Sequence, residues 1–93
     1  MNVGILQFTL HLEGCSSLKE KRSVVKSLKD RARRRFNLAI AEVADHDYWQ
    51  TATLAVVSVG VDARSAEGTL RAFLAFVEDS RDASLADHQI EIL

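Results

Sequence analysis

A strict two-residue alternation of side chains opens the chain and limits what it can fold into. Apolar residues or glycine occupy every second position of this segment: Gly4, Leu6, Phe8, Leu10 and Leu12. Successive side chains of a β-strand point to opposite faces of a sheet, so this period is typical of a strand with one face in the core. We therefore expect a first strand over residues 3–12, which ends where the segment 13–16 breaks the alternation.

Two later segments repeat apolar residues at the spacing of an α-helix. The first begins at Ser17, which forms a capping box with Glu20, and should stop near Asn37. Its apolar stripe comprises Leu18, Val25, Leu28, Ala32 and Phe36. The second is capped by Asp62 or Ser65 and ends near residues 79–80. Its stripe comprises Ala66, Leu70, Phe73, Leu74 and Val77.

Three further segments have strand-like patterns, over residues 38–43, 51–61 and 85–93. The near-continuous apolar run of residues 51–61 predicts a central strand that is covered on both faces. The resulting order is β-α-β-β-α-β, which indicates an α+β fold of the ferredoxin-like class. We expect a single domain over residues 1–93, with a four-stranded antiparallel sheet in the order 4-1-3-2 and both helices on one face.

Positive charge is concentrated in the first predicted helix. Residues 18–35 hold nine of the twelve Lys and Arg residues and two acids, a net charge of +7, whereas the whole chain has a net charge of −1. On a helical wheel, Arg22, Lys26, Lys29 and Arg33 fall together beside the apolar stripe, and Lys19 lies at its edge. Several bases on one face can contact successive phosphates, so we expect an RNA-binding surface here. A solvated helix face, or a surface that meets an acidic protein, remains an alternative.

Lys21 differs from the other bases of this helix. Its phase places it near the apolar stripe, where its stem can cover the edge of the core. Its ammonium group can pair there with a carboxylate from the neighbouring strand, such as Glu42. We therefore expect a structural role for Lys21.

The outward positions of the first and third strands indicate a contact between subunits. They carry aliphatic residues (Val3, Ile5, Val57 and Val59) beside Gln7, Thr9 and His11, and no Phe, Tyr or Trp. Sheet-face RNA recognition needs aromatic residues on which bases can stack, so that mode is rejected. Burial against a second copy suits an aliphatic face better, and we expect a homodimer.

No group of residues identifies a reaction, and we expect neither an enzyme nor a cofactor. His46 and Asp47 lack the further ligands of a metal site, and Tyr48 and Trp49 should pack the hairpin against the body or a partner. Cys15 precedes a helix but lacks an adjacent base, so we interpret it as a structural thiol. The loop before the first helix could hold an anion, as in acylphosphatases, but no Asn stands near the position on the third strand where those enzymes need one.

The single cysteine excludes an intramolecular disulfide, and no apolar run approaches the ~20 residues of a membrane span. The N-terminus has no basic region ahead of its apolar stretch. These features predict a cytoplasmic protein without a membrane partner.

Several ordered blocks of the sequence resemble the YlxP-like bacterial proteins, a family of unknown function. The blocks are Ser17–Arg22, Val24–Leu28, Arg35–Val43, Asp47, Trp49–Gln50, Ala52–Leu54, Val59 and Asp62–Arg64. The resemblance implies a ferredoxin-like fold, an intracellular bacterial protein and genes that often neighbour those of translation initiation and ribosome maturation. It attaches no catalytic role to any matched residue. We therefore expect a non-enzymatic protein that binds RNA or a ribosomal subunit. The alternatives are a protein-interaction scaffold and, third, a small enzyme of the acyl-phosphate type.

Overall fold

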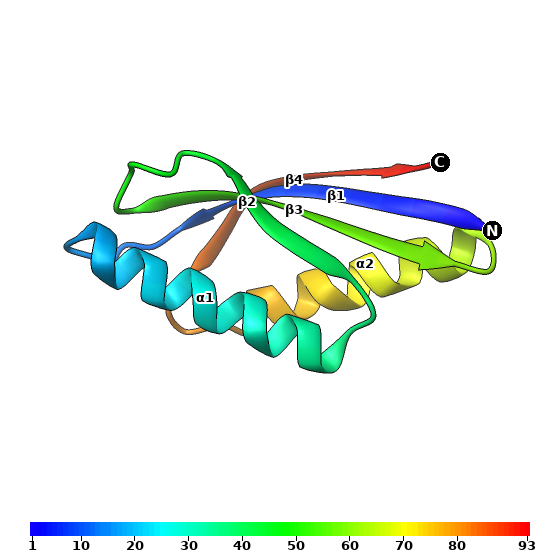
Figure 1. Ribbon diagram of the computed structural model, residues 1–93, viewed down its shortest axis with the longest axis horizontal. Coiled ribbons are helices and arrows are strands. Elements are labelled where there is room, and N and C mark those ends of the chain that lie inside the picture. Colours follow the sequence, from blue (N-terminus) through cyan, green and yellow to red (C-terminus); the bar gives the residue numbers. More distant parts are fainter.

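Four antiparallel strands form one open sheet, and two helices cover one of its faces (Figure 1). The computed structural model describes all residues from Met1 to Leu93. Its elements are β1 (Asn2–His11), α1 (Leu18–Arg35), β2 (Ala39–Ala44), β3 (Thr51–Gly60), α2 (Ala63–Glu78) and β4 (Ser84–Ile92). The strand order β2-β3-β1-β4 is the predicted order 4-1-3-2 counted from the other edge, so the ferredoxin-like prediction is confirmed. Neither helix combines the length and the hydropathy that a membrane-spanning helix needs.

The core lies between the sheet and the two helices. The predicted inward side chains of β1 are buried, with Leu6 and Leu10 at 0% exposure and Phe8 at 1%. Phe8 meets Phe73 of α2 edge to face, with ring centroids 5.5 Å apart. Because each fully buried apolar side chain stabilises the fold by roughly 1.5–3 kcal/mol, this layer is the main source of stability. The apolar stripe predicted for α2 is buried at all five of its positions.

Side chains satisfy the first amide groups of both helices. Ser17 Oγ accepts a hydrogen bond from the Glu20 backbone amide at 3.1 Å, as the capping box predicts. The Glu20 carboxylate binds the amide and the hydroxyl of Ser16, one residue earlier than in a standard capping box. Asp62, rather than Ser65, caps α2, because its Oδ1 accepts from the Ser65 amide at 2.8 Å.

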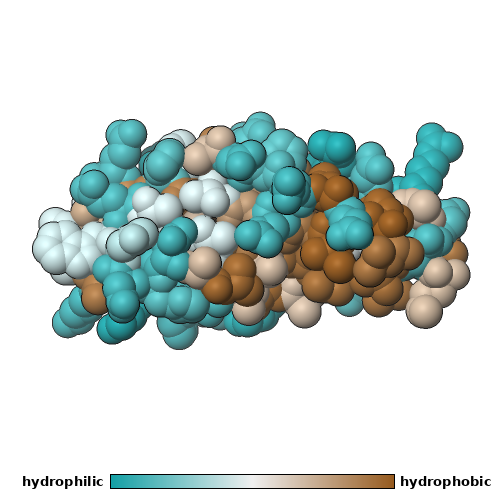
Figure 2. Space-filling view, turned by 90° about the horizontal axis from the view of Figure 1, so that it is seen from above, coloured by the Kyte–Doolittle hydropathy of each residue, from teal (hydrophilic) through white to brown (hydrophobic).

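The other face of the sheet is open, which corrects one prediction. β3 is central, but it is not covered on both faces in the single chain. Val57 and Val59 are 39% and 56% exposed. The continuous apolar run of β3 thus combines one core face with one open aliphatic face. Figure 2 shows hydrophobic side chains gathered at the end of this face where β1 begins and β3 ends.

Candidate nucleic-acid interface

The five predicted phosphate-binding residues lie together along one flank of α1. We call Lys19, Arg22, Lys26, Lys29 and Arg33 the basic stripe. Arg33 shows that the stripe lies beside the edge strand β2, because its Nη2 donates to the Ile40 carbonyl of that strand at 3.1 Å. Four of the five side chains are exposed and Lys29 is half-buried. At a rise of about 1.5 Å per residue, the stripe extends for about 21 Å along the helix.

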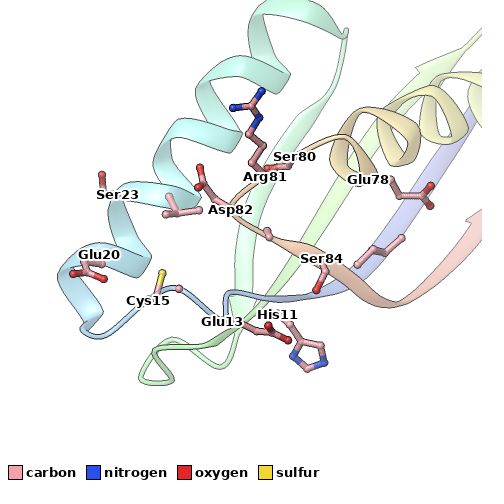
Figure 3. A pocket seen from close by; sticks show the side chains of 14 residues that line it. His11, Glu13, Cys15, Glu20, Ser23, Glu78, Ser80, Arg81, Asp82 and Ser84 are labelled. Atoms are coloured by element: carbon pink, nitrogen blue, oxygen red, sulfur yellow. The ribbon is translucent and has the colours of Figure 1, made fainter.

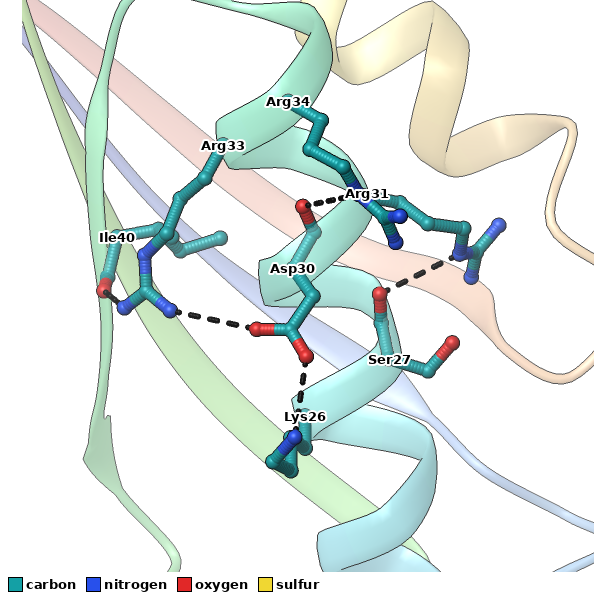
Figure 4. A network of polar contacts seen from close by, with 7 residues as sticks. All are labelled: Lys26, Ser27, Asp30, Arg31, Arg33, Arg34 and Ile40. Atoms are coloured by element: carbon teal, nitrogen blue, oxygen red, sulfur yellow. Dashed lines mark hydrogen bonds and ion pairs between the residues drawn. The ribbon is translucent and has the colours of Figure 1, made fainter.

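One carboxylate, Asp30, partly neutralises the basic stripe (Figure 4). Lys26 Nζ lies 3.2 Å from Asp30 Oδ2, and Arg33 Nη1 lies 3.7 Å from Oδ1. The hydrogen bond from Lys26 lowers the pKa of the Asp30 carboxyl below its ordinary value of 3.8, and nearby positive charges lower it further. The other three members of the stripe form no ion pair. The stripe with Asp30 therefore retains a net charge of about +4 for an external anion.

The remaining late bases of α1 are held by local contacts. Arg31 and Arg35 place their guanidinium groups over the ring of Phe76 in α2, 5.6 and 5.5 Å from its centroid. Arg34 Nε donates to the carbonyl of Asp30 at 3.3 Å. The cation–π contacts of Arg31 and Arg35 contribute about 0.5–1 kcal/mol each at exposed sites. Of these three late bases, Arg31 and Arg35 pack on α2 and Arg34 bonds within α1, whereas the basic stripe lies beside β2.

Lys21 is buried, and it ties α1 to the β2–β3 hairpin. Its side chain is 1% exposed, and Nζ lies 2.9 Å from Glu42 Oε2. Nζ also donates to the Asp45 carbonyl at 2.5 Å. The predicted pairing with Glu42 is confirmed, and the burial of Lys21 accords with the structural role expected for it. Because no group donates a hydrogen bond to Glu42 Oε2, this buried oxygen depends on the Lys21 charge.

Hydrogen bonds also fix the hairpin tip, residues 45–50, beside the start of α1. Asp45 has a φ of 61° and accepts a hydrogen bond from Thr53 Oγ1 through Oδ2 at 2.6 Å. Gln50 Nε2 donates to the Cys15 carbonyl at 3.2 Å, and the Gln50 carbonyl accepts from the Leu12 amide at 2.9 Å. The tip is therefore held at its Asp45 end by β3 and at its Gln50 end by the segment that leads into α1.

Two aromatic side chains project from this anchored tip. Tyr48 is 62% exposed and Trp49 is 52% exposed. The expectation that they pack against the body is wrong for the single chain, which leaves a partner as the predicted contact. Sequence reasoning missed this exposure, because the conformation of the tip depends in part on the Gln50–Cys15 hydrogen bond, which joins residues 35 positions apart.

A cavity of about 760 Å³ opens between the β1–α1 loop and the α2–β4 loop (Figure 3). Its lining is rich in acids, with Glu13, Glu20, Glu78 and Asp82. Cys15 also lines it, and Figure 3 shows the His11 ring pointing away from the thiol, so the two form no nucleophile–base pair. Burial raises the pKa of the Cys15 thiol above its ordinary 9.0, and the Glu20 charge raises it further. No cluster of three or more His, Cys, Asp or Glu side chains has the arrangement of a metal site.

The predicted subunit-contact residues form a second surface on the open face of the sheet. The register pairs Val3 with Val59 and Ile5 with Val57 across β1 and β3. All four side chains point away from the helices and are half-buried or exposed. The structure thus brings these four residues together, on a different face from the basic stripe.

Comparisons with known proteins agree with the family resemblance of the sequence blocks. Residues 3–90 match the family described as "Protein of unknown function (DUF503)". Over 76 residues the chain is 30% identical to a protein of Bacillus subtilis (strain 168) described as "Uncharacterized protein YlxP". That match covers 82% of this chain and 83% of the relative. The chain therefore belongs to the DUF503 family of YlxP-like proteins.

Proposed function

We propose that this protein is a non-enzymatic RNA-binding protein that docks on structured RNA, such as that of a ribosomal subunit, through the basic stripe. The observation that carries the proposal is the separation of charge. A net positive flank about 21 Å long lies on a protein whose overall charge is −1. Phosphate contacts of this kind release counterions and bind RNA without regard to its sequence. This role places the protein in the cytoplasm.

The pairing within the stripe supports this proposal. Exposed ion pairs contribute only about 0–1 kcal/mol, so the contact between Lys26 and Asp30 can exchange for a phosphate at little cost. Arg22 lies one turn before Lys26 and forms no ion pair. Neither base has to leave a buried partner in order to contact RNA.

Two matched charge reversals test the proposal. The stripe variant Arg22→Glu/Lys26→Glu removes one free base and one base paired with a carboxylate four residues away. The control Arg64→Glu/Arg71→Glu makes the same charge change, since Arg71 pairs with Glu67 four residues away. Fluorescence anisotropy with a ribosomal RNA fragment should show at least a tenfold loss of affinity for the stripe variant and a much smaller loss for the control. An equal loss of affinity in the two variants would mean that net charge alone governs RNA binding, and it would refute the basic stripe as the binding site.

We also propose that a second copy of the chain covers the open face of the sheet. On this face Val57 and Val59 are 39% and 56% exposed, and Val3 and Ile5 lie opposite them in the register of β1 and β3. This face therefore has the contiguous exposed aliphatic patch that typically marks a protein–protein contact. Its aliphatic residues adjoin polar ones such as Gln7 and Gln89, which matches the apolar core and polar rim of such interfaces.

Light scattering on the purified protein tests this interface. Val57→Lys should convert a dimer to a monomer, whereas Ala72→Lys, on the exposed side of α2, should leave it dimeric. A monomeric parent protein would refute the homodimer.

An acidic protein partner that binds the basic stripe while RNA does not would favour the scaffold function instead.

A further inference from the structure

We propose that the hairpin tip, residues 45–50, is a stacking platform for an unpaired base, so that the RNA substrate is single-stranded where it meets the start of α1. This inference rests on the proposed RNA-binding function and names its substrate class. It starts from Tyr48 and Trp49, whose exposed rings neither the core nor the open sheet face uses.

The tip and the first bases of the stripe belong to one anchored unit. The buried Lys21 binds the tip through the Asp45 carbonyl. Lys19 and Arg22 lie in the same first turns of α1 as Lys21, two residues before it and one residue after it, and both are exposed and form no ion pair. The Lys21 contact therefore holds the aromatic rings and two free positive charges at the same end of the molecule.

This combination is the one that single-stranded RNA requires. Aromatic side chains stack on the faces of bases that are not paired, while Lys and Arg contact the backbone. In a duplex the base faces are stacked on one another and unavailable, so exposed rings add nothing to duplex affinity. The single-strand preference follows from Tyr48 and Trp49, whereas the basic stripe accepts phosphates from either form.

Two properties of the tip suit it to this role. The hydrogen bonds of Asp45 and Gln50 hold the loop before RNA arrives, so binding orders little of the backbone. Asp47 is the exposed carboxylate of the tip, and its charge disfavours a phosphate there. A strand that follows the stripe with its phosphates therefore presents a base to the rings at this end.

The single tryptophan of the chain, Trp49, reports directly on stacking. We would titrate the purified protein with an oligouridylate about ten nucleotides long and with an RNA duplex of about ten base pairs. The oligouridylate should quench Trp49 fluorescence, and the duplex should bind with little quenching. By anisotropy, Trp49→Ala should weaken oligouridylate binding by about 5- to 150-fold and leave duplex binding within about twofold.

Tyr48→Ala provides an independent variant that keeps the reporter. Tyr48 is more exposed than Trp49, so its removal should not impair folding, which circular dichroism checks. It should weaken binding of the single strand and spare the duplex. Salt-sensitive binding of both RNAs that neither variant alters, without quenching, would overturn the stacking platform and leave the proposed function standing. Failure of both RNAs to bind would overturn the proposed function, and the inference with it.

Discussion

Replacement of Lys21 by Met should destabilise the fold more than any other charge removal on α1. The substitution keeps an unbranched apolar side chain in the buried site. It removes the ammonium group that pairs with Glu42 and donates a hydrogen bond to the Asp45 carbonyl. Removal of one partner of a buried ion pair costs about 3–5 kcal/mol. Since Glu42 is still 15% exposed, water can reach it in part, and we expect the lower end, about 3 kcal/mol.

That loss is large for a chain of 93 residues. A domain of this size has a free energy of unfolding of roughly 5–14 kcal/mol. Each 1 kcal/mol shifts the midpoint of thermal unfolding by about 4–8 °C, so Lys21→Met should lower it by about 12–24 °C. Urea denaturation followed by far-ultraviolet circular dichroism measures the free-energy difference directly.

Two further variants separate the ion pair from a general effect of charge. Lys19→Met removes an exposed base two residues away and should change stability by no more than about 0.5 kcal/mol. The double variant Lys21→Met/Glu42→Leu replaces the pair with apolar groups and should recover much of the loss. A loss below about 1 kcal/mol for Lys21→Met, or no recovery in the double variant, would refute the structural role of the pair.

Three other predictions follow from the structure. Cys15 should react with a thiol reagent at pH 8 far more slowly in the folded protein than in urea, since burial raises its pKa; equal rates would contradict its burial. Hydrogen bonds from the Ser16 amide and hydroxyl lower the pKa of Glu20 in the folded protein below its ordinary value of 4.5. The ionised Glu20 carboxylate therefore stabilises the fold fully above pH 4.5, and this stabilisation is lost as the pH falls through the pKa of the folded protein. The stability deficit of Glu20→Gln should therefore be present at about pH 7 and shrink at about pH 3 in urea titrations, whereas a constant deficit would exclude this linkage. Gly60→Ala places a Cβ 2.5 Å from the backbone nitrogen of Ala66 and should destabilise the fold by about 1–3 kcal/mol or more. Gly68→Ala, which meets open space in α2, should stabilise the fold by about 0.5–1 kcal/mol. Thermal unfolding of both variants checks this, and similar effects would contradict the close approach at Gly60.

The sequence predicts the architecture well because its signals are local. The two-residue period of β1 and the helical period of α2 each specify a buried face without reference to the rest of the chain. The same periodicity gives the phase of Lys21, from which its contact with Glu42 follows. The expectation that β3 is covered on both faces is wrong for the single chain, because an apolar run does not distinguish a covered face from an exposed aliphatic one.

The candidate site is predicted only in part. The basic stripe follows from helical spacing. Its ion pairs with Asp30 can also be predicted from the sequence, because Lys26 and Arg33 lie four and three residues from Asp30 on the same helix. The exposed rings of Tyr48 and Trp49 depend instead on Gln50, which binds a carbonyl 35 residues away. The acidic cavity likewise joins the segment around Glu13 to the segment around Asp82, and no local pattern connects the two.

The salt dependence of RNA binding tests the central proposal most directly. The basic stripe has five bases, and Asp30 offsets one of them, so about four phosphates should be neutralised. The logarithm of the association constant should then fall with the logarithm of the salt concentration with a slope of about −3 for single-stranded RNA. The variant Arg22→Glu/Lys26→Glu should reduce the magnitude of that slope by about half or abolish binding. A slope near zero, or an absence of binding at about 50 mM salt, would contradict RNA docking through the basic stripe.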